Sequence, residues 1–365
     1  MFALFTNRIR RPVERDGAAF YVLLTLLSFA LSVLVTRLFL QLTGYPQLGG
    51  NTLHIAHLLW GGLLLFIGAL AMLIFANRWV YRLGAILTGV GVGLFIDEVG
   101  KFITRTNDYF YPPAAPIIYA FFLLVVLLYL QIRRPRKRNA RAELYRVFDT
   151  LEEVLERDLD DVEYESLKIR LEYVVKHADY PEQALLAKAL LRFIHSERVA
   201  LVERRPGWGE RSMLRLKTWD ERWITKGRLK AVLVGGLGTL GLWAVQDMAK
   251  FLFAFFSPLQ LQRSLMNLAI AGRLTGRTSL NWLEASVSLQ AACGMIILIG
   301  TILLILDHDR RGFSLSFLGL LLLLTMTNML EFYFDQFSTI GPALIEFALL
   351  LLLIHYRTRF IPARV

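Results

Sequence analysis

Two histidines, His54 and His57, stand three residues apart in the stretch "NTLHIAHLLWGG", where a polar segment gives way to a long apolar one. Residues at positions i and i+3 lie on one face of a helix, so the two imidazoles are expected to point the same way. Imidazole nitrogen is a ligand for zinc, iron and manganese ions. The spacing therefore predicts part of a metal site, to which other segments must add ligands.

Carboxylates at the end of the next apolar segment are the candidate partners. The stretch "GLFIDEVGKF" contains Asp97, Glu98 and Lys101, and the loop that follows it contains Asp108. If the two segments cross a membrane in opposite directions, these side chains and the histidines reach the same membrane face. Trp60, three residues after the second histidine, would separate the site from lipid.

We predict that His54, His57 and Glu98 bind one divalent transition metal, namely zinc, iron or manganese. Adjacent residues on a helix are about 100° apart, so Asp97 and Glu98 cannot both point at one centre. Asp97 or Asp108 would then serve as the catalytic base, or would accept a hydrogen bond from a histidine ligand and so orient it. Two imidazoles and one or two carboxylates leave a position for an exchangeable water, as in catalytic metal sites.

Each of these residues also has a simpler interpretation. His54 and His57 would bind lipid headgroups if they only mark the membrane interface. Asp97 would form a salt bridge with Lys101 at i+4. Asp108 would cap a turn ahead of two prolines. The metal site is thus predicted from the joint placement of these groups and not from any one of them.

The composition requires a membrane around this site. Of the 365 residues, 55% are hydrophobic and only 19% are charged, and the mean hydropathy is +0.48. A bilayer core is spanned by about 20 consecutive apolar residues in a helix. The sequence predicts an all-α polytopic membrane protein with eight transmembrane helices: Phe20–Leu42, Leu53–Phe75, Leu83–Phe102, Ala114–Ile132, Leu229–Phe256, Trp282–Leu306, Phe313–Phe334 and Ala343–Tyr356.

Basic residues predict how these spans are oriented. Arginines and lysines cluster before span 1, between spans 2 and 3, after span 4, between spans 6 and 7 and after span 8. All of these segments fall on one side if the spans alternate, and that side is the cytoplasm by the positive-inside rule. We therefore expect both termini in the cytoplasm of a cell with an inner (plasma) membrane. The net charge of +11 follows from this topology and does not indicate nucleic-acid binding.

An insert between spans 4 and 5 reads as a small cytoplasmic helical domain. Its stretch "AELYRVFDTLEEVLERDLDD" has the apolar spacing of an amphipathic helix. Asp160 and Glu163 have the pattern of a capping box for a second helix, and Pro181 suits the first residue of a third. The chain then divides into three parts: 1–135, 136–226 and 227–365.

The two membrane parts resemble each other as diverged four-helix repeats. His54 corresponds in position to Glu284, and Glu98 corresponds to Glu331, with Asp335 as a further carboxylate near the same end. The second repeat has no histidine at this end of a span. We therefore expect the chemistry in the first repeat and two four-helix units related by a pseudo-two-fold axis along the membrane normal.

Few polar groups lie deeper in the spans. Glu346 falls inside span 8, where we expect it at a helix interface in a protonated or hydrogen-bonded form. The single cysteine, Cys293, falls inside span 6 and cannot form an intramolecular disulfide. A metal site must therefore use histidine, aspartate and glutamate.

The stretch "HIAHLLWG" followed by "FIDEVGKFITRTNDYF" resembles a group of uncharacterised bacterial multi-pass membrane proteins that have a histidine-containing outer turn and a later Asp-Glu pair. The resemblance covers residues 50–132. It implies a bacterial membrane origin and a shared polar site.

Three functions remain open at this point. The first is a metal-dependent enzyme that acts on a lipid or lipid-linked substrate at the outer leaflet, where the metal would activate a water molecule. The second is a transporter or channel for a small solute or ion, which the repeat favours and the lack of a continuous polar path opposes. The third is a sensor or scaffold that signals through the cytoplasmic domain.

Overall fold

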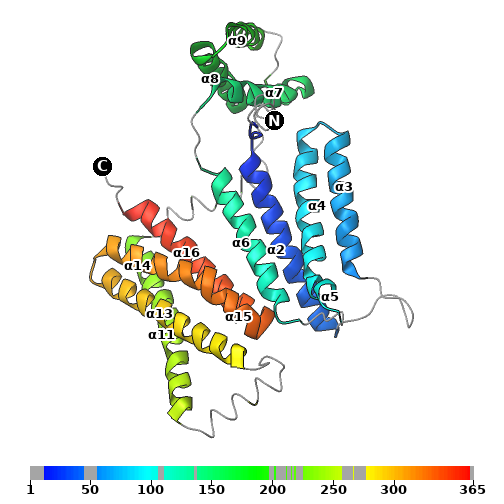
Figure 1. Cartoon of the computed structure of the whole chain (residues 1–365). Coiled ribbons are helices and arrows are strands. Elements are labelled where there is room, and N and C mark those ends of the chain that lie inside the picture. The colour runs from blue at the N-terminus through cyan, green and yellow to red at the C-terminus, as the bar shows by residue number, and fades with distance from the viewer. Residues whose placement is uncertain are drawn as a thin grey trace, which may run out of the picture. The chain divides into compact units, whose positions relative to one another are not determined.

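A computed structural model describes residues 12–44, 56–105, 111–134, 138–196, 201–202, 225–256 and 277–361, together with residues 211, 215, 218 and 266. Eight of its helices are long and apolar enough to cross a membrane, as predicted. Figure 1 labels them along the chain. The candidate spans are α2 (Ala18–Thr43), α3 (His57–Ile74), α4 (Arg78–Asp97), α6 (Ala114–Ile132), α11 (Lys226–Phe256), α13 (Arg277–Ile305), α14 with η1 and α15 (Asp309–Leu322, Leu323–Thr327 and Asn328–Asp335), and α16 (Ile340–Phe360).

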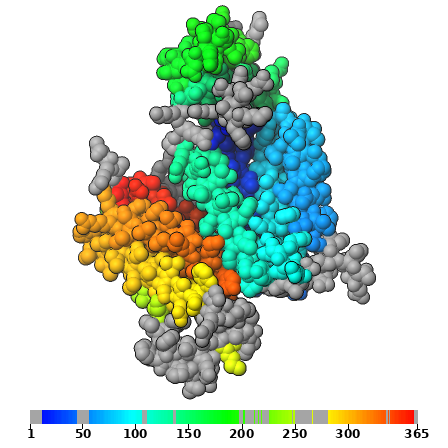
Figure 2. All heavy atoms as spheres, in the orientation of Figure 1, coloured from blue at the N-terminus to red at the C-terminus, as the bar shows by residue number. Residues whose placement is uncertain are grey.

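Apolar side chains cover the outside of these helices. On α3, for example, Leu59, Phe66 and Leu73 are all exposed, and Figure 2 shows this helix and α4 forming an outer face of their unit. A water-soluble protein rarely exposes so large an apolar surface. The surface is instead that of a protein embedded in lipid, which makes this chain an integral membrane protein.

The chain forms two compact units. The first contains Met1–Phe95 and Val125–Arg211, and the second contains Ile96–Leu124 and Ser212–Val365. In each unit, close helix packing depends on small residues, because helices in lipid gain stability from close backbone contact and not from the hydrophobic effect.

In the first unit, α4 packs against two neighbours through two sets of glycines. A Cβ atom added to Gly61 of α3 would lie 2.7 Å from the carbonyl oxygen of Gly91 in α4. On the other side of α4, a Cβ atom added to Gly93 would lie 2.7 Å from the Cβ atom of Ser32 in α2. The Ser32 hydroxyl also donates a hydrogen bond of 3.1 Å to the Val90 carbonyl. Backbone contact on both faces thus holds α4 between α2 and α3.

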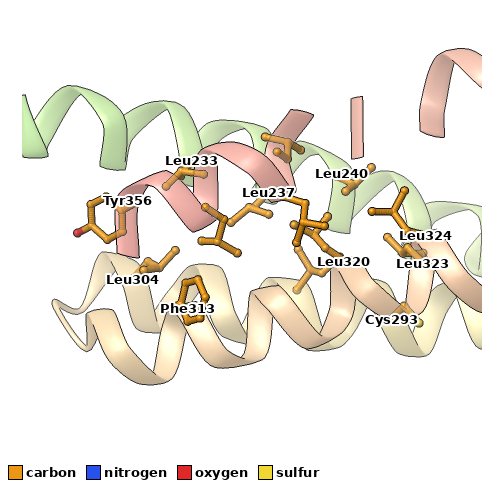
Figure 3. Packing of buried hydrophobic residues seen from close by; sticks show 14 of the residues in the cluster. Leu233, Leu237, Leu240, Cys293, Leu304, Phe313, Leu320, Leu323, Leu324 and Tyr356 are labelled. Carbon is orange, nitrogen blue, oxygen red and sulfur yellow. The ribbon is translucent and has the colours of Figure 1, made fainter. Parts of the chain in front are cut away.

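In the second unit, α13 packs against both α11 and α14, and α16 packs against α11 and α14. A Cβ atom added to Gly294 of α13 would lie 3.0 Å from the carbonyl oxygen of Gly241 in α11. Leucine, isoleucine and aromatic side chains from the four helices fill the space between them, and Figure 3 shows Leu237, Leu320 and Tyr356 among them. In the first half of the chain, the third span (α4) packs between two neighbours. In the second half, the second span (α13) does so. The predicted internal repeat remains a prediction.

Three further helices form the insert: α7 (Ala140–Glu156), α8 (Asp161–His177) and α9 (Pro181–Ile194). Their core contains Leu144, Val147, Leu167, Leu171 and Val174. The capping box is formed as predicted, since the Asp160 carboxylate accepts from the Glu163 amide at 2.7 Å and the Glu163 side chain reaches back to the Asp160 amide. Pro181 is the first residue of α9, also as predicted.

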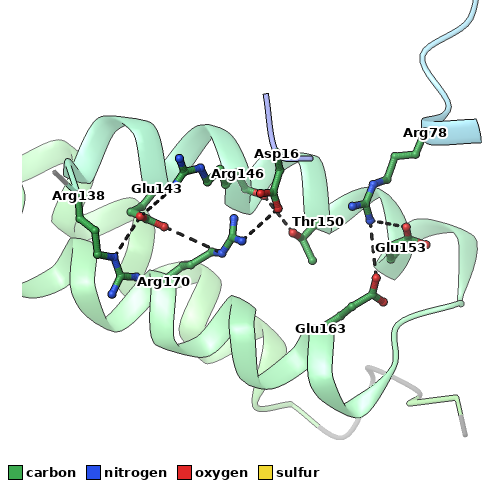
Figure 4. A network of polar contacts seen from close by, with 9 residues as sticks. All are labelled: Asp16, Arg78, Arg138, Glu143, Arg146, Thr150, Glu153, Glu163 and Arg170. Carbon is green, nitrogen blue, oxygen red and sulfur yellow. Dashed lines mark hydrogen bonds and ion pairs between the residues drawn. The ribbon is translucent and has the colours of Figure 1, made fainter. Parts of the chain in front are cut away.

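The insert is attached to the ends of two spans of its own unit. Arg170 of α8 pairs with Asp16, just ahead of α2, at 3.1 Å. Arg78, the first residue of α4, pairs with Glu153 of α7 at 2.5 Å and with Glu163 of α8 at 3.7 Å (Figure 4). These contacts put the start of α2, the α3–α4 turn and the helical insert on one side of the membrane.

Candidate functional site

The predicted histidine turn is described only in part. His57 is the first residue of α3, and Trp60, one turn further, is exposed. His54 and Asp108 lie outside the described residues. The structure therefore shows the helix that begins at His57. That the two imidazoles point the same way is still a prediction.

The Asp-Glu pair lies at a break between two helices. The α4 helix ends at Asp97, a five-residue helix α5 (Val99–Ile103) follows, and Glu98 occupies the joint between them. Asp97 and Glu98 are both buried, with 1% and 0% of their surface exposed. Lys101 forms a 2.6 Å ion pair with Glu98, one position away from the Asp97 partner that the i+4 spacing suggested.

A metal at these residues is still a prediction. In the described part of the chain, no group of three histidine, cysteine, aspartate or glutamate side chains could hold a metal ion. His57 belongs to the first compact unit and Glu98 to the second. The Lys101 ammonium also neutralises Glu98, so a metal ion would have to displace this ion pair before it could bind.

Three carboxylates of the second half were predicted to correspond to the residues of the histidine site, and they lie on α13 and α15. Glu284 is exposed in the first turns of α13, and Glu331 is half-buried on α15. Asp335 is the last residue of α15, and its side chain is outside the described part. Their equivalence to His54 and Glu98 is a prediction that rests on the repeat.

A second polar site lies inside span 7, where the helix changes its hydrogen-bonding pattern. Leu323–Thr327 form one turn of π-helix, and the Asn328 amide donates to the Leu323 carbonyl, five residues back. In a regular α-helix this amide would donate to Leu324. The wider turn thus frees the Leu324 carbonyl for another partner, and such turns often occur at functional sites.

Tyr119 of α6 supplies that partner. Its hydroxyl donates a 2.5 Å hydrogen bond to the Leu324 carbonyl, and both groups are buried. The Tyr119 ring stacks on Phe332 of α15, with ring centroids 4.6 Å apart. A carbonyl released in the membrane interior must find a donor, since lipid offers none. Tyr119 therefore stabilises the π-turn from a neighbouring span.

The residue after the π-turn binds a carboxyl group of span 8. The side-chain amide of Asn328 donates a 2.8 Å hydrogen bond to Glu346 Oε2 on α16, and the two residues are 0% and 3% exposed. Glu346 is thus at a helix interface with a hydrogen-bond partner, as the sequence indicated. The amide oxygen of Asn328, Oδ1, is also buried and has no hydrogen-bond partner among the described residues.

The residues of this site come from three spans and lie at a similar depth in the membrane. Asn328 lies six residues before Phe334, where span 7 ends, and Glu346 lies six residues after Ile340, where α16 begins. At 1.5 Å per residue, both side chains start about 9 Å inside the same end of their spans. Tyr119 lies five residues inside α6. The carboxyl is therefore within the apolar part of the membrane, where an ionisable group is expensive and usually functional.

The oxygen atoms in this part of the two spans are of the types that bind a small cation or a proton. They are the Glu346 carboxylate, the unpartnered Oδ1 of Asn328 and the hydroxyl of Thr327, which lies 3.9 Å from the Cys293 sulfur. Hard monovalent and divalent cations prefer oxygen ligands, and distorted helices in transporters supply them.

One feature of the sequence points to this site. The run "TMTNMLE" brings Thr325, Thr327 and Asn328 into an otherwise apolar span, close to the level of Glu346. A polar run of this kind predicts a buried network, but neither the π-turn nor the contribution of Tyr119 follows from it.

No protein-family model matches the chain, and the searches found no match among curated proteins or solved structures. The site must therefore be interpreted from its own chemistry.

Proposed function

We propose that this membrane protein transports a small cation or is coupled to proton movement, with Glu346 as the residue that binds and releases the ion. The observation that carries the proposal is the buried Asn328–Glu346 pair beside an unsatisfied amide oxygen. A carboxyl at this depth is stable only when it is protonated or paired with a cation. A group that must exchange one for the other is suited to ion transport.

Proteoliposomes containing the purified chain test this proposal. Vesicles loaded with a pH-sensitive dye, and parallel vesicles loaded with a sodium- or potassium-sensitive dye, are exposed in turn to gradients of protons, sodium and potassium. We expect ion movement above that of empty vesicles, and we expect Glu346→Gln to abolish it because the amide cannot bind and release a cation. Glu284→Gln, which removes an exposed carboxyl on α13, is the matched control and should keep wild-type rates. Equal rates in the wild type and in Glu346→Gln would refute the assignment.

A second candidate function is the metal-dependent enzyme at the outer leaflet, acting on a lipid or lipid-linked substrate. It is supported by two adjacent buried carboxyls, Asp97 and Glu98, at a helix break. In this proposal His54, His57 and Glu98 bind zinc, iron or manganese, and Asp97 or Asp108 acts as base. Elemental analysis of the purified wild type and of His57→Ala tests it. Metal above background in the wild type that falls in the variant supports the enzyme, and no metal in either rejects it.

A third candidate is a sensor or scaffold that acts through the helical insert. It is supported by the ion pairs of Arg78, which join α7 and α8 to the first residue of α4. Because α4 is packed between α2 and α3, a displacement of the insert would be transmitted to three spans. Binding of a partner to the insert that alters ion movement would combine this role with the first.

We also propose that both termini and residues 136–226 are cytoplasmic, and that the protein resides in a bacterial inner membrane. The basic segments support this orientation. Cysteines introduced at Gln47 and Asp108 should react with an impermeant thiol reagent added outside intact cells. A cysteine at Lys137 should react only after the membrane is opened, and the reverse pattern would invert the topology.

A further inference from the structure

One face of α7 bears a set of residues that the helical core does not use. Arg141, Tyr145, Phe148, Glu152 and Leu155 follow one another at intervals of three or four residues. At 100° per residue they lie within a stripe about 80° wide. The core residues Leu144 and Val147 point in a different direction, into the packing with α8 and α9. The stripe is therefore a second face of the helix, separate from the one that holds the domain together.

This stripe exposes large apolar side chains. Tyr145 and Phe148 are 52% and 51% exposed, and Leu155 is 84% exposed. The Arg141 guanidinium lies over the Tyr145 ring, 5.8 Å from its centroid. Aromatic rings next to basic residues are typical of the region where lipid headgroups meet water, because each side chain has an apolar body and a polar tip.

The same stripe holds the start of a membrane span. Glu152 accepts a 2.8 Å hydrogen bond from the backbone amide of Arg78, the first residue of α4, and Glu156 accepts one of 3.3 Å from the Asn77 side chain. Acidic residues at the carboxyl end of α7 oppose its own helix dipole, whereas at the amino end of α4 they favour it. Their position is explained by contact with α4.

We propose that the α7 stripe rests on the lipid headgroups of the leaflet in which α4 begins. Glu152 contacts the first residue of α4, which keeps this face of α7 next to the end of a span. Phe148 and Tyr145 lie about 6 and 10 Å further along the same face and extend this surface away from α4. Their exposed rings, with the Arg141 guanidinium over Tyr145, suit the headgroup layer, where an apolar body and a polar tip are both accommodated.

Spin labels on the full-length chain in nanodiscs test the proposal. Cys293 is buried, so a cysteine added at Tyr145 or Phe148 can be labelled selectively. Leu185→Cys on α9, which is 65% exposed, is the matched control. Collisions with oxygen, which dissolves in lipid, are compared with collisions with a water-soluble nickel complex, in nanodiscs of phosphatidylcholine.

We expect labels at positions 145 and 148 to be several-fold better protected from the nickel complex than the label at 185. If both labels are as accessible to nickel as the control, the stripe faces water and the proposal is wrong. Two labelled positions guard against a local disturbance by either substitution.

Discussion

The third and seventh spans take corresponding positions in the two halves of the sequence, and they meet their neighbours in different ways. In α4, glycines such as Gly91 and Gly93 allow backbones to touch on two sides. Span 7 is interrupted by a π-turn, after which Asn328 binds Glu346 of another span. Close packing of small residues stabilises helices in lipid at little cost, whereas buried polar groups are costly there. In the proposed function, α4 therefore supports the fold, and span 7 supplies the hydrogen-bond partner of the carboxyl that binds the ion.

The largest effect on stability is expected for substitutions at the glycine contacts of the first unit. We expect Gly61→Ala to destabilise the protein by about 3 kcal/mol, the upper part of the range for an overpacked site, because the added methyl group meets backbone atoms that cannot move aside. Gly62→Ala is the matched control, since no atom in the described part of the chain lies within 4 Å of an added Cβ atom there. Thermal unfolding in detergent should separate the two. Similar melting temperatures would mean that α3 and α4 do not touch in this way.

Removal of the buried donor of span 7 should have the next largest effect. Asn328→Leu leaves Glu346 without its hydrogen bond, and an unsatisfied buried polar group costs about 2 kcal/mol. A double variant with leucine at both positions should regain much of that loss, because two apolar groups replace two polar ones. Denaturant titration of the three proteins tests this coupling. Additive losses would show that the two side chains do not depend on each other.

A smaller loss is expected for the residue that satisfies the π-turn. Tyr119→Phe keeps the ring stacked on Phe332 and removes only the hydroxyl that binds the Leu324 carbonyl. We expect destabilisation by about 1 kcal/mol, the usual contribution of one hydrogen bond. The melting temperature should fall by less than that of Asn328→Leu. An unchanged melting temperature would indicate that the carbonyl has another donor.

The smallest effect on stability is expected from the ionisation of Glu163, where the insert is attached to α4. Burial raises the pKa of Glu163 above its usual value, and Glu153 and Asp160 add to this, while the Asp160 amide and Arg78 act in the opposite direction. A carboxyl whose pKa is higher in the folded state holds its proton more tightly there. The free energy of unfolding should therefore fall as the pH rises from the unfolded to the folded pKa, and stay constant above it.

Glu163→Gln removes this titration and keeps the side-chain acceptor of the capping box. Just above the usual pKa of a glutamate, we expect the variant to lose a small contribution that makes thermal stability fall with rising pH. The effect is limited because the side chain is 33% exposed and its charge is screened by water. A steeper fall of stability with rising pH in the variant than in the wild type would contradict the sign of the shift.

The parts of the fold that follow from local chemistry could be predicted from the sequence. The lengths of the apolar segments predicted all eight spans, and the capping box and Pro181 predicted where α8 and α9 begin. These features depend on residues close in the chain. The ion pair of Lys101 with Glu98, which lies at a helix break, does not follow from residue spacing alone.

The candidate site could be predicted only in fragments. Glu346 was recognised as an interface carboxyl, but its partner lies on another span, and sequence distance does not give the rotation of one helix against another. The π-turn occurs together with a hydrogen bond from Tyr119 of another span to the Leu324 carbonyl, and this partner cannot be read from the sequence of span 7 alone. The histidine site was predicted from segments that meet only through folding, and it remains to be tested.

The most direct test of the central claim follows the carboxyl group of Glu346 itself. Infrared difference spectra of the protein in lipid, recorded while the pH or the sodium concentration is changed, detect a carboxyl that gains or loses its proton. We predict a carboxyl band in the wild type that is absent in Glu346→Gln and shifted in Asn328→Leu, which removes its hydrogen-bond partner. Identical difference spectra for the wild type and Glu346→Gln would mean that Glu346 does not exchange an ion, and that the buried pair only holds α15 and α16 together.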